Sequence, residues 1–525
     1  MKIIDKYEVA SLIKDGDMVA ISGSGGSGSP EALINSVMTS YLKSNHPCNI
    51  GVTCGISPGN LTNDDVGMNM LAKEGLVGKA ICAHLGMGRV FGNAIGENMF
   101  PAFAVPLGVI NHLYRAIAGH EVGVLTHIGL GTFADPRIEG CCANDKARAL
   151  DPIVEVVNIG GKENLFYHSF PINVALIKGS YADSDGNISL EEEGVIGEQY
   201  NMAIAAHNSG GIVIVEVKDV KSKNSFKARN VLIHSSYVDY VVVNKPDDSL
   251  GEYNIPFYRP EITGDERIKL EDIKIRPLDE RKVCGRRSVM ELHKGYVINL
   301  GVGMPDSVAN VAAEEGISDD IYLSVESGPT GGVPIGGIVF GASINPDSVI
   351  STAEQFDAYN GGSLNMGIVG LAEVDKFGNV NVSKFGTRVT GPGGFINITQ
   401  CTPKIVFMGT FMAGDLEEEI VDGKLIIKNE GKKVKFVDKV EQITFSADQA
   451  IKNNQEVLYV TERCVFRLVK DGVELIEIAP GIDLDKDILA HMDFKPIISK
   501  NLKIMDERIF IDRPMNIKKE FLAKE

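Results

Sequence analysis

Short apolar runs alternate along the chain with longer stretches in which apolar residues recur every three or four positions. Runs of the first kind indicate buried strands and stretches of the second indicate amphipathic helices, so the pattern predicts an α/β protein with a mainly parallel sheet. The first unit has an apolar run at 18–22, a glycine-rich turn at 23–28, and a helix start at Ser29-Pro30-Glu31. Ser29 is the expected N-cap of this helix, whose apolar stripe should run on to Leu42.

A second unit of the same design occurs in the later half of the chain. It has a strand-like run at 296–300, a tight glycine turn, and a helix start at Pro305-Asp306. Two pairs of segments also match at an offset of 192 residues, 185–188 with 377–380 and 212–215 with 404–407. We therefore predict one α/β architecture used twice.

The segment 244–286 is rich in proline and charge and has little apolar periodicity. Such a segment is typical of a boundary between domains. The predicted fold is therefore two related open α/β/α domains with mainly parallel sheets, residues 1–280 and residues 281–525.

The composition narrows the functional classes. Of 525 residues, 44% are apolar and 23% charged, with no Trp, which excludes a disordered chain or a small disulfide scaffold. The formal net charge of −18 disfavours nucleic acid and anionic membranes as partners, although helix N-termini and a few basic side chains can still bind a small anion. The eight cysteines form no C-x-x-C pair, and the histidines, His84 among them, lack metal-ligand spacing. We expect reduced thiols, no metal, no signal peptide or membrane span, and a cytoplasmic location.

The first glycine-rich turn, residues 23–28, satisfies G-x-G-x-x-G between a strand and a helix. A dinucleotide site also needs an acid about twenty residues further on, and no Asp or Glu occurs between Glu31 and Asp64. Two other interpretations stay open: a tight turn that lets helix and strand pack closely, or backbone contact with another phosphate or acyl ligand.

The stretch 326–337 is the most glycine-dense in the chain and begins with Glu326, directly after the apolar run 321–325. A lone carboxylate is thereby expected at the carboxyl end of a parallel strand, where open α/β sheets bind their ligands. The alternative is that Glu326 caps a helix or lies on the surface. A further cluster, residues 390–397, offers bare N–H groups for an oxyanion hole, or is a turn between strands.

These residues carry a resemblance. The chain resembles, from end to end, a family I CoA-transferase of the propionate CoA-transferase type, in which two related halves are fused. The motifs that carry it are Glu326-Ser327-Gly328 followed by Gly331-Gly332-Val333-Pro334, the run 393–400, Asn299-Leu300-Gly301-Val302-Gly303, and the segments 129–136 and 461–466.

The resemblance implies roles for specific residues. Glu326 would be the covalent nucleophile, and the amides of Gly393 and Gly394 would face the thioester oxygen and CoA. Asn299 and the turn Gly301, Val302 and Gly303 would lie beside the CoA thioester.

The resemblance also places Gly23, Ser24, Gly25, Leu107 and Gly108 at the substrate. The turn Ser22-Gly23-Ser24-Gly25 departs from the commoner G-G-F form. Leu107 stands where relatives carry a Gln that hydrogen-bonds the substrate carboxylate. An apolar residue there would enlarge or dry the acyl pocket.

The predicted activity is transfer of CoA from an acyl-CoA to a free carboxylate, by way of an acyl-glutamyl anhydride and a glutamyl-CoA thioester. CoA is a substrate and no permanent cofactor is expected, while small carboxylic acids and further copies of the chain are the expected partners. The alternatives are an acyl-CoA hydrolase on the same scaffold and a non-catalytic sensor of CoA or a sugar phosphate. A nicotinamide-linked dehydrogenase is the least favoured.

Overall fold

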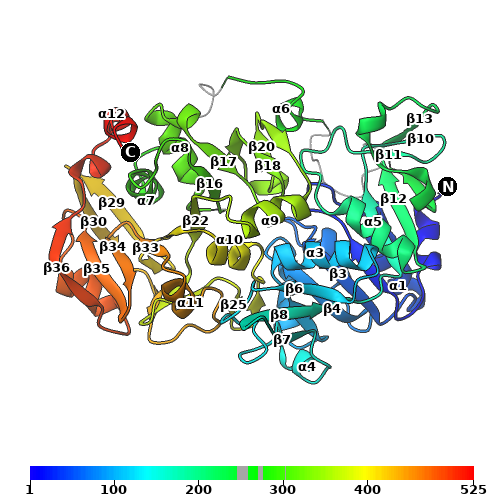
Figure 1. Ribbon diagram of the computed structural model, residues 1–525, viewed down its shortest axis with the longest axis horizontal. Helices are drawn as coiled ribbons and strands as arrows, with labels where there is room; N and C mark the ends of the chain where they lie inside the picture. Colours follow the sequence, from blue (N-terminus) through cyan, green and yellow to red (C-terminus); the bar gives the residue numbers. More distant parts are fainter. Residues whose placement is uncertain (245–257, 270–275, 302, 525) are drawn as a thin grey trace.

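Two separate sheets, one in each half of the chain, organise the computed structural model, which describes residues 1–244, 258–269, 276–301 and 303–524 (Figure 1). The first sheet has eight strands, and every neighbouring pair is parallel. Its strands in spatial order are β1 (Lys2–Ile4), β15 (Tyr240–Val243), β12 (Ile212–Val217), β9 (Val174–Lys178), β2 (Met18–Ile21), β3 (Ile50–Ile56), β4 (Val77–His84) and β5 (Ala102–Ala104).

The second sheet has ten strands, with parallel pairing at its centre from β17 to β33 and antiparallel pairs on both sides of that block. In spatial order they are β21 (Ser348–Val349), β18 (Pro329–Thr330), β17 (Tyr322–Ser324), β16 (Val297–Leu300), β22 (Met366–Gly370), β27 (Lys404–Met408), β33 (Glu456–Val460), β34 (Cys464–Val469), β35 (Gly472–Ile478) and β36 (Ile497–Ile504).

Helices connect most of the parallel strands, as the crossover between parallel neighbours usually requires. Those of the first half are α1 (Glu31–Ser44), α2 (Arg89–Gly96), α3 (Leu107–Ala118), α4 (Asp145–Arg148) and α5 (Gln199–Asn208). Those that follow are α6 (Pro260–Thr263), α7 (Glu280–Val289), α8 (Asp306–Glu314), α9 (Thr352–Asn360), α10 (Phe395–Cys401), α11 (Ala447–Lys452) and α12 (Lys518–Leu522).

The repeated architecture is confirmed element by element. Four strands of the first half, β9, β10 (Tyr181–Asp183), β11 (Ile188–Ser189) and β12, recur 192 residues later as β22, β23 (Glu373–Asp375), β24 (Val380–Asn381) and β27. The turn between the second and third of these is built alike in both halves. Asp183 Oδ1 accepts the Asn187 N–H at 3.0 Å and Asp375 Oδ1 accepts the Asn379 N–H at 3.0 Å. The domain boundary near residue 280, at the start of α7, stays a prediction.

The first helix differs from its expectation in two details. Its N-cap is Pro30, not Ser29, because the Ser29 hydroxyl lies 3.5 Å from the Glu31 carboxylate and makes no capping bond. Leu42 is 63% exposed, whereas Leu33 is fully buried. Nine residues at about 100° each turn Leu42 to the opposite side of the helix from Leu33.

Helix α3 of the first half packs against α9 of the second near the centre of the molecule (Figure 1). Arg115 donates two hydrogen bonds to Asp357, at 2.8 and 3.0 Å, and His112 Nε2 lies 3.1 Å from the same carboxylate. At the other end of α3, the Gly108 N–H donates to Asn397 Oδ1 at 3.1 Å. The contacts bring the carboxyl ends of both sheets to one interface.

Candidate active site

Glu326 lies at the tip of a tight hairpin between β17 and β18. The Val325 N–H donates to the Pro329 carbonyl at 2.9 Å, and the Gly328 N–H donates to the Val325 carbonyl at 3.1 Å. Gly328 has φ +125°, and a Cβ there would overlap the Ile350 carbonyl oxygen, so only glycine fits. The close turn therefore holds the Glu326 side chain beyond the end of the strand.

A buried polar network fixes the strand that carries Glu326. Tyr359 bonds the Ser324 hydroxyl, which also accepts a hydrogen bond from Gln355 Nε2 at 2.9 Å. Asn299 Nδ2 donates to the Ser324 carbonyl at 3.3 Å and to the Tyr359 hydroxyl at 3.2 Å. The Asn299 Oδ1 atom is buried without a hydrogen-bond partner among the described residues. It is therefore available to accept an N–H from a ligand.

The Glu326 carboxylate meets the N-terminus of α10. The Gly394 N–H points to it, and a Cβ on Gly394 would overlap Glu326 Oε2 and lie 2.9 Å from Cδ. Burial raises the pKa of Glu326 to about 7, and the hydrogen bond from Gly394 acts in the opposite direction. A carboxyl with this pKa is half-ionised near neutral pH, and it has little water to shield it.

A cavity of about 330 Å³ opens in front of Glu326. Among the predicted residues, Asn299, Gly301, Gly393 and Gly394 line it. The Gly393 N–H donates to the Ala83 carbonyl at 3.2 Å, so Gly394 is the one of this pair whose amide points at Glu326.

The rest of the predicted 301–303 turn is placed differently from Gly301. Val302 lies outside the described residues. Gly303 does not line the cavity, and its N–H donates to Asp306 Oδ2 at 3.3 Å.

Several residues that line this cavity were not predicted from the sequence. His84 ends β4 of the first half, and burial lowers its pKa to about 4, so it is neutral at physiological pH. Phe340 lies with its ring 6.3 Å from that imidazole, and Met87 and the exposed Arg388 complete this side. No local motif marks these side chains, because they come from segments up to about 240 residues distant from Glu326 and meet only in the fold.

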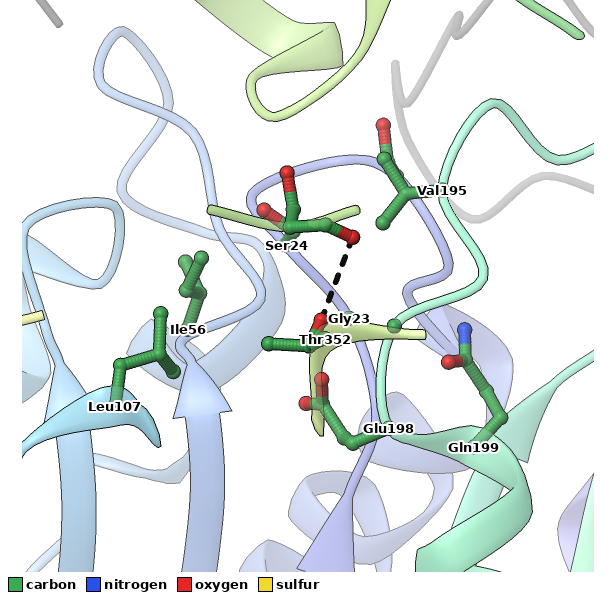
Figure 2. A pocket seen from close by; sticks show the side chains of 11 residues that line it. Gly23, Ser24, Ile56, Leu107, Val195, Glu198, Gln199 and Thr352 are labelled. Atoms are coloured by element: carbon green, nitrogen blue, oxygen red, sulfur yellow. Dashed lines mark hydrogen bonds between the residues drawn. The ribbon is translucent and has the colours of Figure 1, made fainter. Parts of the chain in front are cut away.

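Three of the five predicted residues of the first half lie at a second, smaller cavity, which Ser327 of the hairpin also lines (Figure 2). Gly23, Ser24 and Leu107 line it. Gly25 lies further along the glycine turn, where its carbonyl accepts the Gly59 N–H at 3.0 Å, and it lines neither of the two cavities.

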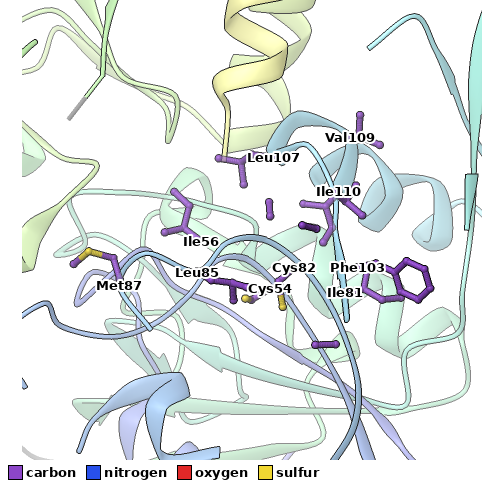
Figure 3. Close-up of a cluster of buried hydrophobic side chains, with 14 of the residues drawn as sticks. Cys54, Ile56, Ile81, Cys82, Leu85, Met87, Phe103, Leu107, Val109 and Ile110 are labelled. Atoms are coloured by element: carbon purple, nitrogen blue, oxygen red, sulfur yellow. The ribbon is translucent and has the colours of Figure 1, made fainter. Parts of the chain in front are cut away.

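Leu107 forms an apolar wall of the smaller cavity together with Ile56 (Figures 2 and 3). It is 1% exposed and belongs to the main core of the protein. Its N–H donates to the Gly393 carbonyl at 2.8 Å. The next residue, Gly108, lines neither cavity and packs against Phe356 and Asn397. This wall is therefore tied to the glycine loop that faces Glu326.

In the described ranges, no group of three or more His, Cys, Asp or Glu side chains is arranged to hold a metal ion. None of the helices in those ranges is long and apolar enough to cross a membrane.

Comparison with known proteins identifies the family. Residues 6–244 match the family model described as Coenzyme A transferase. The chain is 45% identical to a caffeate CoA-transferase of Acetobacterium woodii, over 98% of each chain. The chain belongs to the coenzyme A transferase family. It is also 40% identical to the acetate CoA-transferase YdiF of Escherichia coli O157:H7, over 98% of this chain and 96% of that one.

A solved structure extends the likeness to the fold. The acyl-CoA transferase YdiF of Escherichia coli O157:H7, described as a thioester complex with CoA, superposes with a TM-score of 0.91 at 38% identity, covering 98% of this chain and 97% of that one. The predicted family and fold class are thereby confirmed. This CoA-transferase chain is an enzyme, as expected, and the roles of its individual residues remain proposals.

Replacing Gly394 should test how closely the reacting groups must approach. Gly394→Ala adds a methyl group where Glu326 Oε2 now lies, at a φ of −81° that alanine adopts freely. We expect kcat for CoA transfer to fall by roughly 100-fold or more, because displacement of a reacting group by about 1 Å has that effect. Steady-state kinetics and a melting curve measure it.

Gly119→Ala is the matched control, because its new Cβ would lie 3.6 Å or more from its neighbours, at the far end of α3. It should leave kcat unchanged. Near-normal turnover of Gly394→Ala would contradict the proposed close approach.

Proposed function

We propose that this chain is an acyl-CoA:carboxylate CoA-transferase in which Glu326 is the covalent nucleophile. The observation that carries the proposal is a lone carboxylate at a strand end, beside the Gly394 amide, in a cavity of about 330 Å³. YdiF, whose fold is the same, is described as forming a thioester complex with CoA.

The first half-reaction moves CoA onto the enzyme. A carboxylate oxygen of Glu326 attacks the thioester carbonyl carbon, the C–S bond breaks, and CoA leaves as a thiolate. The product is an acyl-glutamyl anhydride. The thiolate then attacks Cδ of Glu326, the anhydride C–O bond breaks, and the free acid leaves as a carboxylate. The enzyme now carries CoA on Glu326 as a thioester.

The second half-reaction reverses these steps with another acid. The incoming carboxylate attacks Cδ of Glu326 and displaces the CoA thiolate, which then attacks the acyl carbonyl and restores the Glu326 carboxylate. The Gly394 N–H is placed to stabilise the negative charge that develops on the glutamyl carbonyl oxygen. Such a donor contributes about 3 kcal/mol in other enzymes.

CoA enters this scheme as a substrate and is held only during turnover. We propose that Asn299 Oδ1 and the backbone at Gly301 and Gly393 contact the thioester arm of CoA. The exposed guanidinium of Arg388, at the cavity, provides positive charge for the phosphate groups. The remainder of an acidic protein, with net charge −18, offers a polyanion little attraction.

An acyl-CoA hydrolase remains the second candidate for this scaffold, because water attacking the same intermediate would release acid and CoA. Measuring thiol release with and without an acceptor carboxylate separates the two activities, since hydrolysis needs no acceptor.

We also propose that the enzyme works in the cytoplasm as a homo-oligomer. All eight cysteines are free in the described structure, which suits a reducing compartment.

The Glu326 adduct is the direct test of the mechanism. Incubation with an acyl-CoA and no acceptor should place CoA on Glu326, and borohydride should reduce that thioester to an alcohol, abolishing activity. Peptide mass spectrometry locates the change. Glu326→Ala should lose activity by several orders of magnitude while its stability moves by less than about 1 kcal/mol, because no core packing is removed.

An adduct on a different carboxylate, or near-normal turnover of Glu326→Ala, would overturn the assignment. Glu326→Gln serves as the isosteric control, since it keeps the volume and removes the nucleophile.

The rate of the first half-reaction should depend on pH through Glu326. Its pKa is raised to about 7, and only the ionised form attacks. We therefore expect the rate of loading to fall about tenfold per pH unit below 7 and to level off above it. Rapid-mixing measurement of CoA adduct formation between pH 5 and 8 tests this. A rate that does not change between pH 8 and pH 5 would be evidence against it.

Leu107 should influence which acids are accepted. Leu107→Gln puts an amide into the apolar wall. We expect kcat/KM for short acids, divided by kcat/KM for long acids, to rise by about tenfold, because a longer apolar tail loses its contacts there. A panel of acceptors with acetyl-CoA as donor measures the shift, with acetate and caffeate, the acids named for the two relatives, at its ends. Leu107→Met, apolar and similar in size, should keep the original profile, and an unchanged profile in Leu107→Gln would show the idea to be wrong.

A further inference from the structure

The smaller cavity contains a second glutamate, Glu198, which has no role in the mechanism given above. Glu198 is the N-cap of α5, is 5% exposed, and lines the cavity beside Gln199 (Figure 2). The volume is about 10 Å³, which is room for roughly one water molecule. We call this cavity the Glu198 subsite.

One oxygen of the Glu198 carboxyl is left without a hydrogen-bond partner, although the backbone N–H groups of Gly55, Gly23 and Glu198 itself lie close to the carboxyl. Glu198 Oε1, Gln199 Oε1 and Asn111 Oδ1 are all buried and have no hydrogen-bond partner among the described residues. The Asn111 amide is also close to Glu198, since a Cβ on Gly55 would lie 3.2 Å from Glu198 Oε1 and 3.3 Å from Asn111 Nδ2. A protonated Glu198 has an O–H that it can donate to a ligand in this cavity, whereas the carboxylate form only accepts.

The electrostatics agree with a neutral Glu198. Burial raises its pKa to about 8, against the effect of the nearby backbone amides of Gly55 and Gly23. The titratable groups that face it are Cys54 of β3 and Tyr114 of α3. A hydrogen bond with Cys82, and then burial, raises the pKa of Cys54 well above its ordinary range, and burial does the same for the pKa of Tyr114, so both are uncharged too. No Lys or Arg lines the Glu198 subsite.

The Glu198 subsite adjoins the reacting carboxylate on two sides. Ser327, the residue after Glu326, lines it, and so does Leu107, whose N–H is bonded to Gly393. The Leu107 Cδ1 atom and Glu198 Oε1 flank the same glycine, since a Cβ on Gly55 would lie 3.1 Å from the one and 3.2 Å from the other. Leu107 therefore places an apolar side chain beside Glu198 and offers no side-chain hydrogen-bond donor there.

The internal repeat provides an independent observation. Met18 of β2 pairs with Gly51 of β3 in the first half, and Val297 of β16 pairs with Tyr322 of β17 in the second. Gly55 lies four residues after Gly51, and Glu326 lies four residues after Tyr322. Gly55 is therefore the counterpart of Glu326. Glu198 and Gly394 are likewise the N-caps of the equivalent helices α5 and α10. Each half thus has one glutamate and one glycine at this point. In the first half the glutamate caps the helix and the glycine belongs to the strand, and in the second half the two are exchanged.

We propose, on the basis of the proposed function, that Glu198 in its protonated form is the specificity-determining donor to one oxygen of the incoming acceptor carboxylate, an atom about the size of the water molecule that this subsite can hold. An O–H donor to a carboxylate makes a short, charge-assisted hydrogen bond and needs no cation. When Glu198 loses its proton, it repels the same ligand. A subsite without Lys or Arg also has no partner for a second carboxylate, so the acids it selects are monocarboxylates with an uncharged tail.

The test uses the second half-reaction alone. Enzyme loaded with CoA on Glu326, and freed of excess acyl-CoA, is mixed with propionate between pH 6.5 and 9.5, and the acyl-CoA formed is measured against propionate concentration. In this form Glu326 carries CoA as a thioester and cannot titrate, and propionate is ionised over the whole pH range. Neither group therefore contributes to the pH dependence. Blanks without propionate correct for hydrolysis of the thioester.

We expect the wild-type KM for propionate to rise about tenfold per pH unit above 8, with little change in the maximal rate. Glu198→Gln, whose amide is a donor at every pH, should show a flat KM, and Glu198→Ala should show a raised KM throughout. Glu31→Gln is the matched control, because Glu31 is another buried glutamate with a pKa raised to about 8 that lies outside the Glu198 subsite and accepts the Gly67 N–H. It should keep the wild-type rise.

A wild-type KM that does not rise, or a rise that persists in Glu198→Gln, overturns this proposal and leaves the proposed function intact. Failure of the wild-type enzyme to load CoA on Glu326 overturns both. Should Glu198→Gln fail to load, Leu107→Gln decides the matter, since its amide places a permanent donor beside Glu198 and should make the rise of KM above pH 8 smaller than in the wild type. Succinate, with its second charge, should have a kcat/KM at least tenfold below that of butyrate, and equal values would contradict the charge selection.

Discussion

The contact between the Glu326 carboxylate and the Gly394 amide is the constraint on which the rest of this site depends. The approach is so close that a single methyl group on residue 394 would occupy the place of Oε2. It requires the β17 hairpin of the second half to be held from behind by Tyr359 and Asn299, and α10 to begin at the right point. A carboxylate held in this way has a pKa near 7 and little hydration, two properties that favour attack on a thioester.

The two halves meet so that each contributes to a site that neither contains alone. The second half supplies Glu326 and Gly394, while the first supplies His84 at the large cavity and Leu107 and Glu198 at the small one. The ion pair of Arg115 with Asp357 and the bond from Gly108 to Asn397 hold the helices at this interface. The repeat explains the arrangement, because two open α/β sheets that face each other with their strand ends enclose a crevice between them.

How much of this the sequence could predict depended on how local each feature is. The strand-turn-helix units, the 192-residue offset and the position of Glu326 at the end of a strand were predictable, because each depends on a short stretch of chain. The prediction of Ser29 as the N-cap was wrong because the Ser29 hydroxyl lies beside the Glu31 carboxylate, which sequence spacing does not reveal. His84 and Glu198 were missed as site residues for a different reason: each reaches its cavity only when segments more than 100 residues apart come together.

On the proposed mechanism, water exclusion separates transfer from hydrolysis, and we expect it to act at the small cavity beside the reacting carboxylate. The glutamyl thioester persists only while its carbonyl is shielded, and the small cavity beside it has room for about one water molecule. Leu107 and Ile56 form its apolar side, and the polar side includes the unpartnered oxygens of Glu198 and Gln199 together with the hydroxyls of Ser24, Ser27 and Thr352. A water molecule there would find acceptors to bind but no ionised carboxylate to take its proton, as long as Glu198 stays neutral. Burial keeps Glu198 protonated. In that form, on our proposal, Glu198 donates a hydrogen bond to the acceptor acid and cannot act as a general base toward water.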